Sequence, residues 1–183
     1  MKKFILVIAL LVSSEVGAQL GDDGVYYLTR ADKDMLAAMN KNGVNWNDVY
    51  IEFIQLLNAY RREKCLDTLT YSQSAYDAAK FQSEYSYSIK KLTHQSNMLG
   101  YETFTDRTNK FNCKSNTGGE CGLMFSLFNI CVHHQTIAEH ILWMWQYSPA
   151  HNHILLKPDV KNVGLCSTSN GKGGVPFIFL VVY

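Results

Sequence analysis

Apolar residues recur at the spacing of an amphipathic α-helix after a polar N-terminal stretch. From residue 49 onward they fall three or four positions apart, at Val49, Phe53, Leu56, Leu57 and Tyr60. Asn47 and Asp48 directly precede Val49, and the side chain of either residue can cap the first turn of a helix. The pattern predicts a first helix that begins after this cap and ends between Arg62 and Lys64.

The same spacing predicts further helices. A second helix begins at a cap on Ser72 or Ser74 and runs to about Lys90, with small residues on one face that favour close packing. A third helix ends before Pro149, and its stripe is formed by Ile130, His134, Ile137, Ile141 and Trp145. A short helix follows, with Pro149 at its first position and Ser148 as its cap.

The C-terminal part of the chain predicts strands. Residues 160–166 and 175–183 have strand-like sequences and are joined by the turn-rich segment STSNGKGG. The last strand, VPFIFLVVY, is almost wholly apolar, which is typical of a central strand buried on both faces. Helices packed on a small antiparallel sheet satisfy this order of elements, so we expect one α+β domain.

The segment between the second and third helices has the composition of a long loop. Residues 93–121 are rich in Thr, Asn and Gly, and loops of this length are often functional. The chain has five cysteines, so disulfide formation would leave at least one unpaired. The best candidate pair is Cys113 with Cys121, which would close the short loop KSNTGGE; for the other cysteines, free buried thiols are the alternative.

The N-terminus has the three parts of a secretory signal peptide. Two lysines are followed by an apolar run at residues 4–12 and by the small-residue cleavage site Val16-Gly17-Ala18. Nine apolar residues are too few to cross a bilayer, which takes about 20 helical residues. We expect a secreted or periplasmic protein without a membrane span after cleavage. Its expected organisation is a signal peptide at residues 1–18, an N-terminal extension at 19–46 and one domain at 47–183.

The charge balance excludes one class of partner. Without the signal peptide, 15 basic and 15 acidic residues remain, so the net charge is about zero, and no basic run occurs. Such a surface does not attract phosphate backbones, and we therefore expect no nucleic-acid binding.

Four motifs make the chain resemble a known family. They are, in order, LLNAYRREKCLDTLTYSQSAYDAAKFQ, THQS, GGEC and WQYSPAHNHILLKPDVKNVGLC. Over residues 50–183 their order and spacing resemble the CAP superfamily, which includes cysteine-rich secretory proteins, venom allergens and plant pathogenesis-related proteins, and especially its shorter bacterial branch. The resemblance implies a three-layer α-β-α sandwich with a small central antiparallel sheet and a cleft.

The resemblance also implies which residues line that cleft. His94 in THQS and His151 in SPAH match its two histidines, and Glu120 in GGEC matches its glutamate, with Cys121 in place of the usual asparagine. The second acidic position is occupied by Ser148. In some members the cleft holds a divalent metal, so His94 and His151 are the expected ligands of zinc or a similar ion.

A second group of histidines is an alternative candidate for a metal site, but its spacing does not favour one. The third helix carries His133, His134, Glu139 and His140. The outer two histidines are two helical turns apart, and the order differs from the His-Glu-x-x-His motif of zinc proteases. We interpret this group as surface and partly packed residues. His153 diverges from His151 by about 200° on a helix and is expected to be exposed.

The expected function is binding of a ligand in the cleft, with a metal ion, another small molecule, a lipid, a glycan or a protein as possible partners. The alternative is a secreted hydrolase, metal-dependent or Ser/Cys-dependent, that acts on peptide or cell-envelope substrates. Its catalytic candidates are Glu120, Ser148 and Ser96, with Cys121 as a further nucleophile. The sequence contains no Gly-x-Ser-x-Gly elbow.

Overall fold

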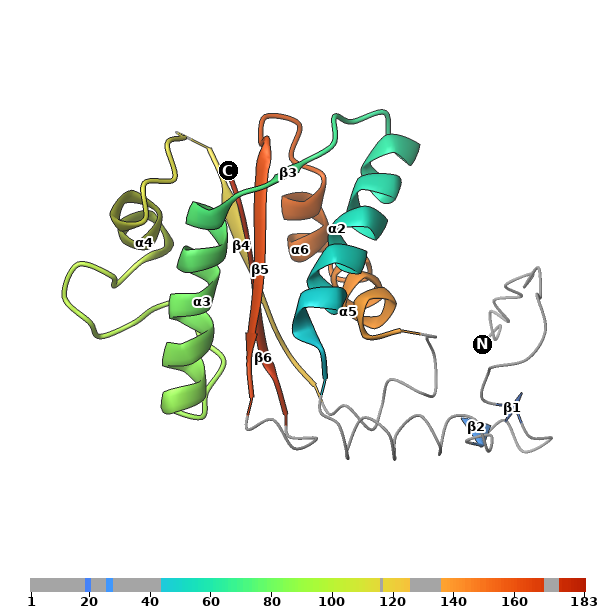
Figure 1. Cartoon of the computed structure of the whole chain (residues 1–183), viewed down its shortest axis with the longest axis horizontal. Helices are drawn as coiled ribbons and strands as arrows, with labels where there is room; N and C mark the ends of the chain where they lie inside the picture. The colour runs from blue at the N-terminus through green and yellow to red at the C-terminus, as the bar shows by residue number, and fades with distance from the viewer. Residues whose placement is uncertain (1–18, 21–25, 28–43, 116, 126–135, 170–174) are drawn as a thin grey trace, which may run out of the picture.

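Helices cover both faces of a central sheet, which gives the chain three layers (Figure 1). The computed structural model describes residues 19–20, 26–27, 44–115, 117–125, 136–169 and 175–183. On one face of the sheet lie α3 (Gln73–Ser88) and α4 (Phe104–Lys110). On the other lie α2 (Trp46–Glu63), α5 (Ile137–Gln146) and α6 (Pro149–Leu155). The expected α-β-α sandwich is confirmed.

The sheet has four strands in the order β3-β5-β6-β4. Their bounds are Thr70–Tyr71 for β3, Gly119–Met124 for β4, Asn162–Thr168 for β5 and Phe177–Val182 for β6. The three longer strands pair antiparallel, as expected, but β3 pairs parallel to β5, so the sheet is mixed. All six residues of β6 are buried, which confirms the prediction of a central strand covered on both faces.

The predicted helices form, but α5 begins only at Ile137, so the prediction of one continuous stripe from Ile130 is wrong. The cap of α2 is Asn45, whose side chain accepts from the backbone N–H of Asn47, so the helix begins earlier than expected. Ser72 caps α3, as predicted. In α5 the cap is Thr136, which forms a reciprocal capping box with Glu139. The earlier part of the predicted third helix lies outside the described residues.

The expectation of one long loop at residues 93–121 is wrong, because it contains a helix and the start of a strand. Thr103 caps α4 through a capping box with Asp106, and this box supports a helix of only two turns. The β4 sequence GECGLM has two glycines, which have low strand propensity, so its pairing with β6 is set by the tertiary structure.

The sheet separates two hydrophobic cores. The larger one fills the space towards α2, α5 and α6, where Phe53 meets the buried ring of Trp145 edge-on at 5.5 Å. In the smaller one, α3 approaches β5 at Gly164, where a Cβ atom would collide with backbone atoms of Ala75 and Tyr76. The small residues on α3 therefore permit the close packing that the sequence indicated.

The predicted disulfide between Cys113 and Cys121 is not formed. Cys113 packs in the smaller core beside α3, whereas Cys121 points into the larger core on the opposite face of the sheet. All four cysteines in the described part of the chain are free thiols, the remaining two being Cys65 and Cys166. The separation by a sheet layer explains why the short spacing in sequence misled the prediction.

The N-terminal expectations are mostly untested by the structure. Residues 1–18, the expected signal peptide, lie outside the described residues. Within the N-terminal extension, β1 (Gln19–Leu20) pairs antiparallel with β2 (Tyr26–Tyr27). No helix among the described residues is long and apolar enough to cross a membrane.

Candidate functional site

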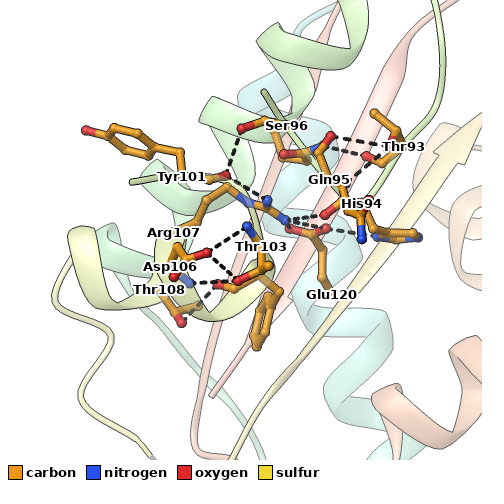
Figure 2. Close-up of polar contacts among 12 residues, drawn as sticks. Thr93, His94, Gln95, Ser96, Tyr101, Thr103, Asp106, Arg107, Thr108 and Glu120 are labelled. Atoms are coloured by element: carbon orange, nitrogen blue, oxygen red, sulfur yellow. Dashed lines mark hydrogen bonds and ion pairs between the residues drawn. The ribbon is translucent and has the colours of Figure 1, made fainter. Parts of the chain in front are cut away.

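Glu120 lies on the edge strand β4 and is held in a buried network of charges (Figure 2). His94, in the segment that follows α3, places its Nδ1 2.9 Å from Oε1 of Glu120. A carboxylate can only accept hydrogen bonds, so Nδ1 of His94 carries the donated proton. In the neutral imidazole Nε2 then keeps a free lone pair, and the half-exposed ring can offer it to a ligand.

Arg107 is the third member of this network and was not anticipated from the sequence. Its guanidinium is fully buried, and its Nη2 lies 2.8 Å and 2.7 Å from the two oxygens of Glu120. It also donates to the backbone carbonyls of Tyr101 and His94. Arg107 balances the negative charge of Glu120, because both carboxylate oxygens accept hydrogen bonds from its guanidinium. The Thr-x-x-Asp capping box before Arg107 was the one sequence signal that could have placed it on a helix.

His151 approaches from the opposite face of the sheet. It lies on α6, whose first residue is Pro149 as predicted, and its ring is 6.4 Å from the ring of Trp145. Partial burial, together with the nearby imidazole of His94, lowers the pKa of His151 below its ordinary value. His151 is therefore neutral at pH 7.

Both histidines lie beside the same short piece of β4. A Cβ atom on Gly122 would be 3.3 Å from Cε1 of His94, on the face towards α3. On the other face, the thiol of Cys121 lies 3.9 Å from the backbone carbonyl of His151. Residues 120–122 of β4 are therefore flanked by one histidine on each side of the sheet.

The free edge of β4 presents unpaired backbone groups at this place. Asn162 and Tyr183 donate their backbone N–H groups to each other's carbonyls. In an antiparallel sheet the residues of a central strand bond alternately to one neighbouring strand and to the other, so the odd-numbered residues of β6 bond to β5. Even-numbered residues of β6 consequently bond to β4, and they pair with Gly119 and Cys121. The N–H and C=O groups of Glu120 and Gly122 face away from β6 and have no hydrogen-bond partner in the described part of the chain.

Two of the candidate nucleophiles, Ser96 and Cys121, are in poor states for catalysis. Ser96 is buried and donates its hydroxyl to the carbonyl of Tyr101 at 2.8 Å. The thiol of Cys121 has a pKa far above its ordinary value, because burial and the charge of Glu120 both disfavour the thiolate. Ser148 occupies the cap position of α6, but its side chain makes no capping hydrogen bond, contrary to our expectation.

The remaining histidines do not join the site. His140 is buried and packs against the ring of Phe125 at 4.8 Å. His153 is exposed, as predicted. His133 and His134 lie outside the described residues.

The donor set fits a metal ion poorly. Both oxygens of Glu120 are engaged by Arg107, and a serine stands at the second acidic position. Among the residues that the structure describes, no group of three or more His, Cys, Asp or Glu side chains could hold a metal ion. Metal binding by His94 and His151 stays a prediction. The described residues offer no third protein ligand beside these two histidines.

Comparison with known proteins decides the family. The model of the CAP family, described as the cysteine-rich secretory protein family, matches residues 54–183. This chain belongs to the CAP family. The match includes His94, Glu120, Ser148 and His151, so the motif assignments rest on a matched domain.

Solved structures of bacterial CAP proteins share the fold. An extracellular protein with an SCP domain from Bacillus anthracis superposes with a TM-score of 0.59 at 20% identity, covering 74% of this chain and 40% of its own. An outer surface protein from Borrelia burgdorferi gives 0.57 at 16% identity, covering 84% and 93%. A cysteine-rich secretory protein from Staphylococcus aureus gives 0.55 at 13% identity, covering 74% and 38%.

At these identities the likeness shows the fold and not the activity. This chain spans less than half the length of the Bacillus and Staphylococcus proteins, which therefore contain further sequence outside the shared domain. The search of curated proteins returned no match.

Proposed function

We propose that this chain is an exported CAP-domain protein that binds a ligand, without chemical turnover, at the edge of β4 between His94 and His151. The observation that carries the proposal is the pair of unpaired backbone positions, Glu120 and Gly122, flanked by the ring of His94 on one face and by the backbone of His151 on the other. The N–H and C=O groups along a free strand edge can pair with a ligand that offers matching groups, so this edge beside a family motif favours ligand binding.

The chemistry of the edge indicates what such a ligand must offer. Gly122 presents one donor and one acceptor along the edge, and the N–H and C=O of Glu120 repeat the pattern two residues away. Nε2 of His94 adds an acceptor when the ring is neutral. A ligand with amide, hydroxyl or carboxyl groups can satisfy this set, which is compatible with a peptide, a glycan or a polar lipid headgroup.

Binding is favoured over hydrolysis by the state of the candidate catalytic groups. Both oxygens of Glu120 accept hydrogen bonds from the buried guanidinium of Arg107, so they are already engaged. The hydroxyl of Ser96 is committed to a carbonyl, and the thiol of Cys121 is protonated. A hydrolase requires a nucleophile beside an available base, and neither Ser96 nor Cys121 meets this requirement.

Export is part of the proposal. Its support is the three-part N-terminal sequence, together with the extracellular and outer-surface descriptions of the Bacillus and Borrelia proteins that share the fold. The test is the intact mass of the protein recovered outside the cytoplasm. It should correspond to a chain that begins at Gln19, and a cytoplasmic, full-length chain would contradict export.

The binding proposal can be tested with a defined panel of probes. Calorimetry would compare the protein with zinc chloride, a chitin tetrasaccharide, an acetylated and amidated Thr-Val-Thr-Val peptide, and a short-chain phosphatidylglycerol below its critical micelle concentration. We expect at least one probe to bind and His151→Ala to weaken it by about tenfold or more, as the loss of one good hydrogen bond does.

His153→Ala is the matched control, because His153 lies on the same helix and is exposed. The control should bind like the unaltered protein. A protein that binds none of the probes, or that loses affinity equally in both variants, would contradict the proposal. Turnover of an ester or peptide substrate that is abolished by Glu120→Gln would instead support the hydrolase.

A further inference from the structure

Two large apolar side chains protrude from the segment that joins His94 to α4. The side chain of Leu99 is 92% exposed and that of Met98 is 49% exposed. Leu99 is the most exposed of the large hydrophobic residues in the described part of the chain. In Figure 1 the segment between α3 and α4 forms a loop that stands out from the body of the molecule.

The exposure follows from a specific turn. The N–H of Tyr101 donates to the carbonyl of Met98 at 2.9 Å, and Gly100 between them has φ +80°. A positive φ at the third position, with no positive φ at Leu99 in the second, matches a type II turn, and it favours glycine there. Leu99 occupies the second position and is therefore held at the tip, where little of it is covered by its own chain.

The base of the turn is fixed by hydrogen bonds. Ser96 donates its hydroxyl to the carbonyl of Tyr101 at 2.8 Å and accepts from the N–H of Met98 at 3.3 Å. The buried guanidinium of Arg107 donates to the same carbonyl of Tyr101. Figure 2 shows Ser96 and Arg107 converging on this residue. Since the base is held by buried groups, the tip cannot fold back to bury its leucine without breaking them.

Aromatic and cationic side chains lie directly behind the tip. The ring of Tyr101 stacks on Phe81 with 4.4 Å between centroids, and Nζ of Lys110 lies 5.5 Å from the centroid of Tyr101. Lys90 and Lys91, at the start of the same segment, are also exposed. An apolar tip followed by a tyrosine and then by lysines matches the polarity profile of a bilayer from acyl chains to headgroups.

We propose that the Met98–Leu99 turn inserts into the interfacial region of a lipid bilayer and attaches the domain reversibly to a membrane surface. Lys110, beside Tyr101 at the base of the turn, favours an anionic surface through electrostatic attraction. This proposal does not depend on the ligand site at β4. It assigns a lipid surface as the partner of the turn, separate from any ligand bound between the histidines.

A membrane accounts for this turn better than a protein partner does. A stable protein interface takes about 800 Å² from each side, arranged as an apolar core with a polar rim. Here the two apolar side chains are flanked by polar residues, the exposed Asn97 before them and the exposed Thr103 after them. A bilayer needs no such area, because it surrounds a narrow convex tip and gains from each apolar side chain that leaves water.

The test is co-sedimentation of the purified protein without its signal peptide with extruded vesicles. One set consists of phosphatidylcholine, and the other of three parts phosphatidylcholine and one part phosphatidylglycerol. We expect binding to the mixed vesicles and weaker binding to the neutral ones. Leu99→Ser should reduce the partition coefficient by about tenfold, and Met98→Ser by less, because Met98 is already half-buried.

Ile51→Ser is the matched control, because Ile51 is 60% exposed but lies on α2, on the other face of the sheet. It should bind like the unaltered protein. A second readout is Leu99→Trp, whose tryptophan emission should shift to shorter wavelength on adding mixed vesicles. Absence of vesicle binding, an equal loss in Ile51→Ser, or no emission shift in Leu99→Trp would each overturn the proposal.

Discussion

The two histidines of the site have contrasting surroundings. On the α3 side, His94 is oriented by a buried ion pair, in which Glu120 and Arg107 satisfy each other. On the α6 side, His151 is placed by a short helix whose Leu155 is fully buried in the larger core. One ring therefore depends on charge complementarity and the other on apolar packing. The difference predicts distinct responses to mutation and to pH.

The largest expected effect comes from breaking the ion pair. Arg107→Met leaves Glu120 buried without its cation, and removing one member of such a pair costs about 3–5 kcal/mol. The free energy of unfolding, measured by urea denaturation, should fall by this amount. Lys110→Met, on the same helix but exposed, should change it by less than about 0.5 kcal/mol.

A double variant separates lost charge from lost packing. Arg107→Met combined with Glu120→Gln removes both charges, and it should recover part of the stability that the single change loses. If the double variant were less stable than Arg107→Met alone, the ion pair would not be what holds the α3 side.

The next effect tests the α6 side. Leu155→Ala creates a cavity in the larger core and should cost about 3 kcal/mol in the same measurement. It should also weaken ligand binding through His151, because α6 would lose its anchor, while the hydrogen bond of His94 to Glu120 stays intact. Equal changes in the NMR signals of both imidazoles would contradict the separation of the two sides.

A smaller effect is expected from pH. The pKa of His151 is lowered in the folded protein, so the unfolded chain binds a proton more readily. Above the unfolded pKa of about 6.5, His151 does not change the free energy of unfolding. As the pH falls below this value, the free energy of unfolding decreases by at most about 1.4 kcal/mol per pH unit. His151→Gln should remove that slope between pH 6.5 and pH 5. The same slope in both proteins would show that another group is responsible.

The smallest expected effect concerns the cysteines, which lie on both sides of the sheet. Because Cys113 and Cys121 are free and buried, a reductant should leave the melting temperature unchanged. A thiol reagent should modify the exposed Cys65 in the native protein and leave both buried thiols unmodified until the protein unfolds. Loss of stability on reduction would indicate a disulfide.

The sequence predicts the elements whose pattern is periodic or uniformly apolar. The spacing from Val49 to Tyr60 defines α2, Ser72 marks the start of α3, and the apolar run at β6 identifies the central strand. The motif resemblance also identifies His94, Glu120 and His151 as neighbours, which periodicity alone cannot do. Their convergence depends on segments far apart in the chain.

The buried ion pair between Arg107 and Glu120 could not be predicted from the sequence. Arginine is almost always at the surface, so nothing in FTDRTNK indicates that Arg107 is fully buried beside Glu120. The two glycines of β4 have low strand propensity, so the sequence did not predict this strand. The strand is stabilised by its pairing with β6. A carboxylate that resembles a metal ligand in sequence is, in the structure, neutralised by a cation from a helix that the sequence did not predict.

The most direct test of the central claim is the response of individual β4 amides in ¹⁵N-resolved NMR during titration with the tightest-binding probe of the panel. The N–H groups of Glu120 and Gly122 point to the free edge, whereas those of Gly119 and Cys121 are bonded to β6 and serve as internal controls. We expect large downfield shifts at Glu120 and Gly122 and small shifts at the two controls. Equal shifts at all four, or no shift at Gly122, would contradict ligand binding at this edge.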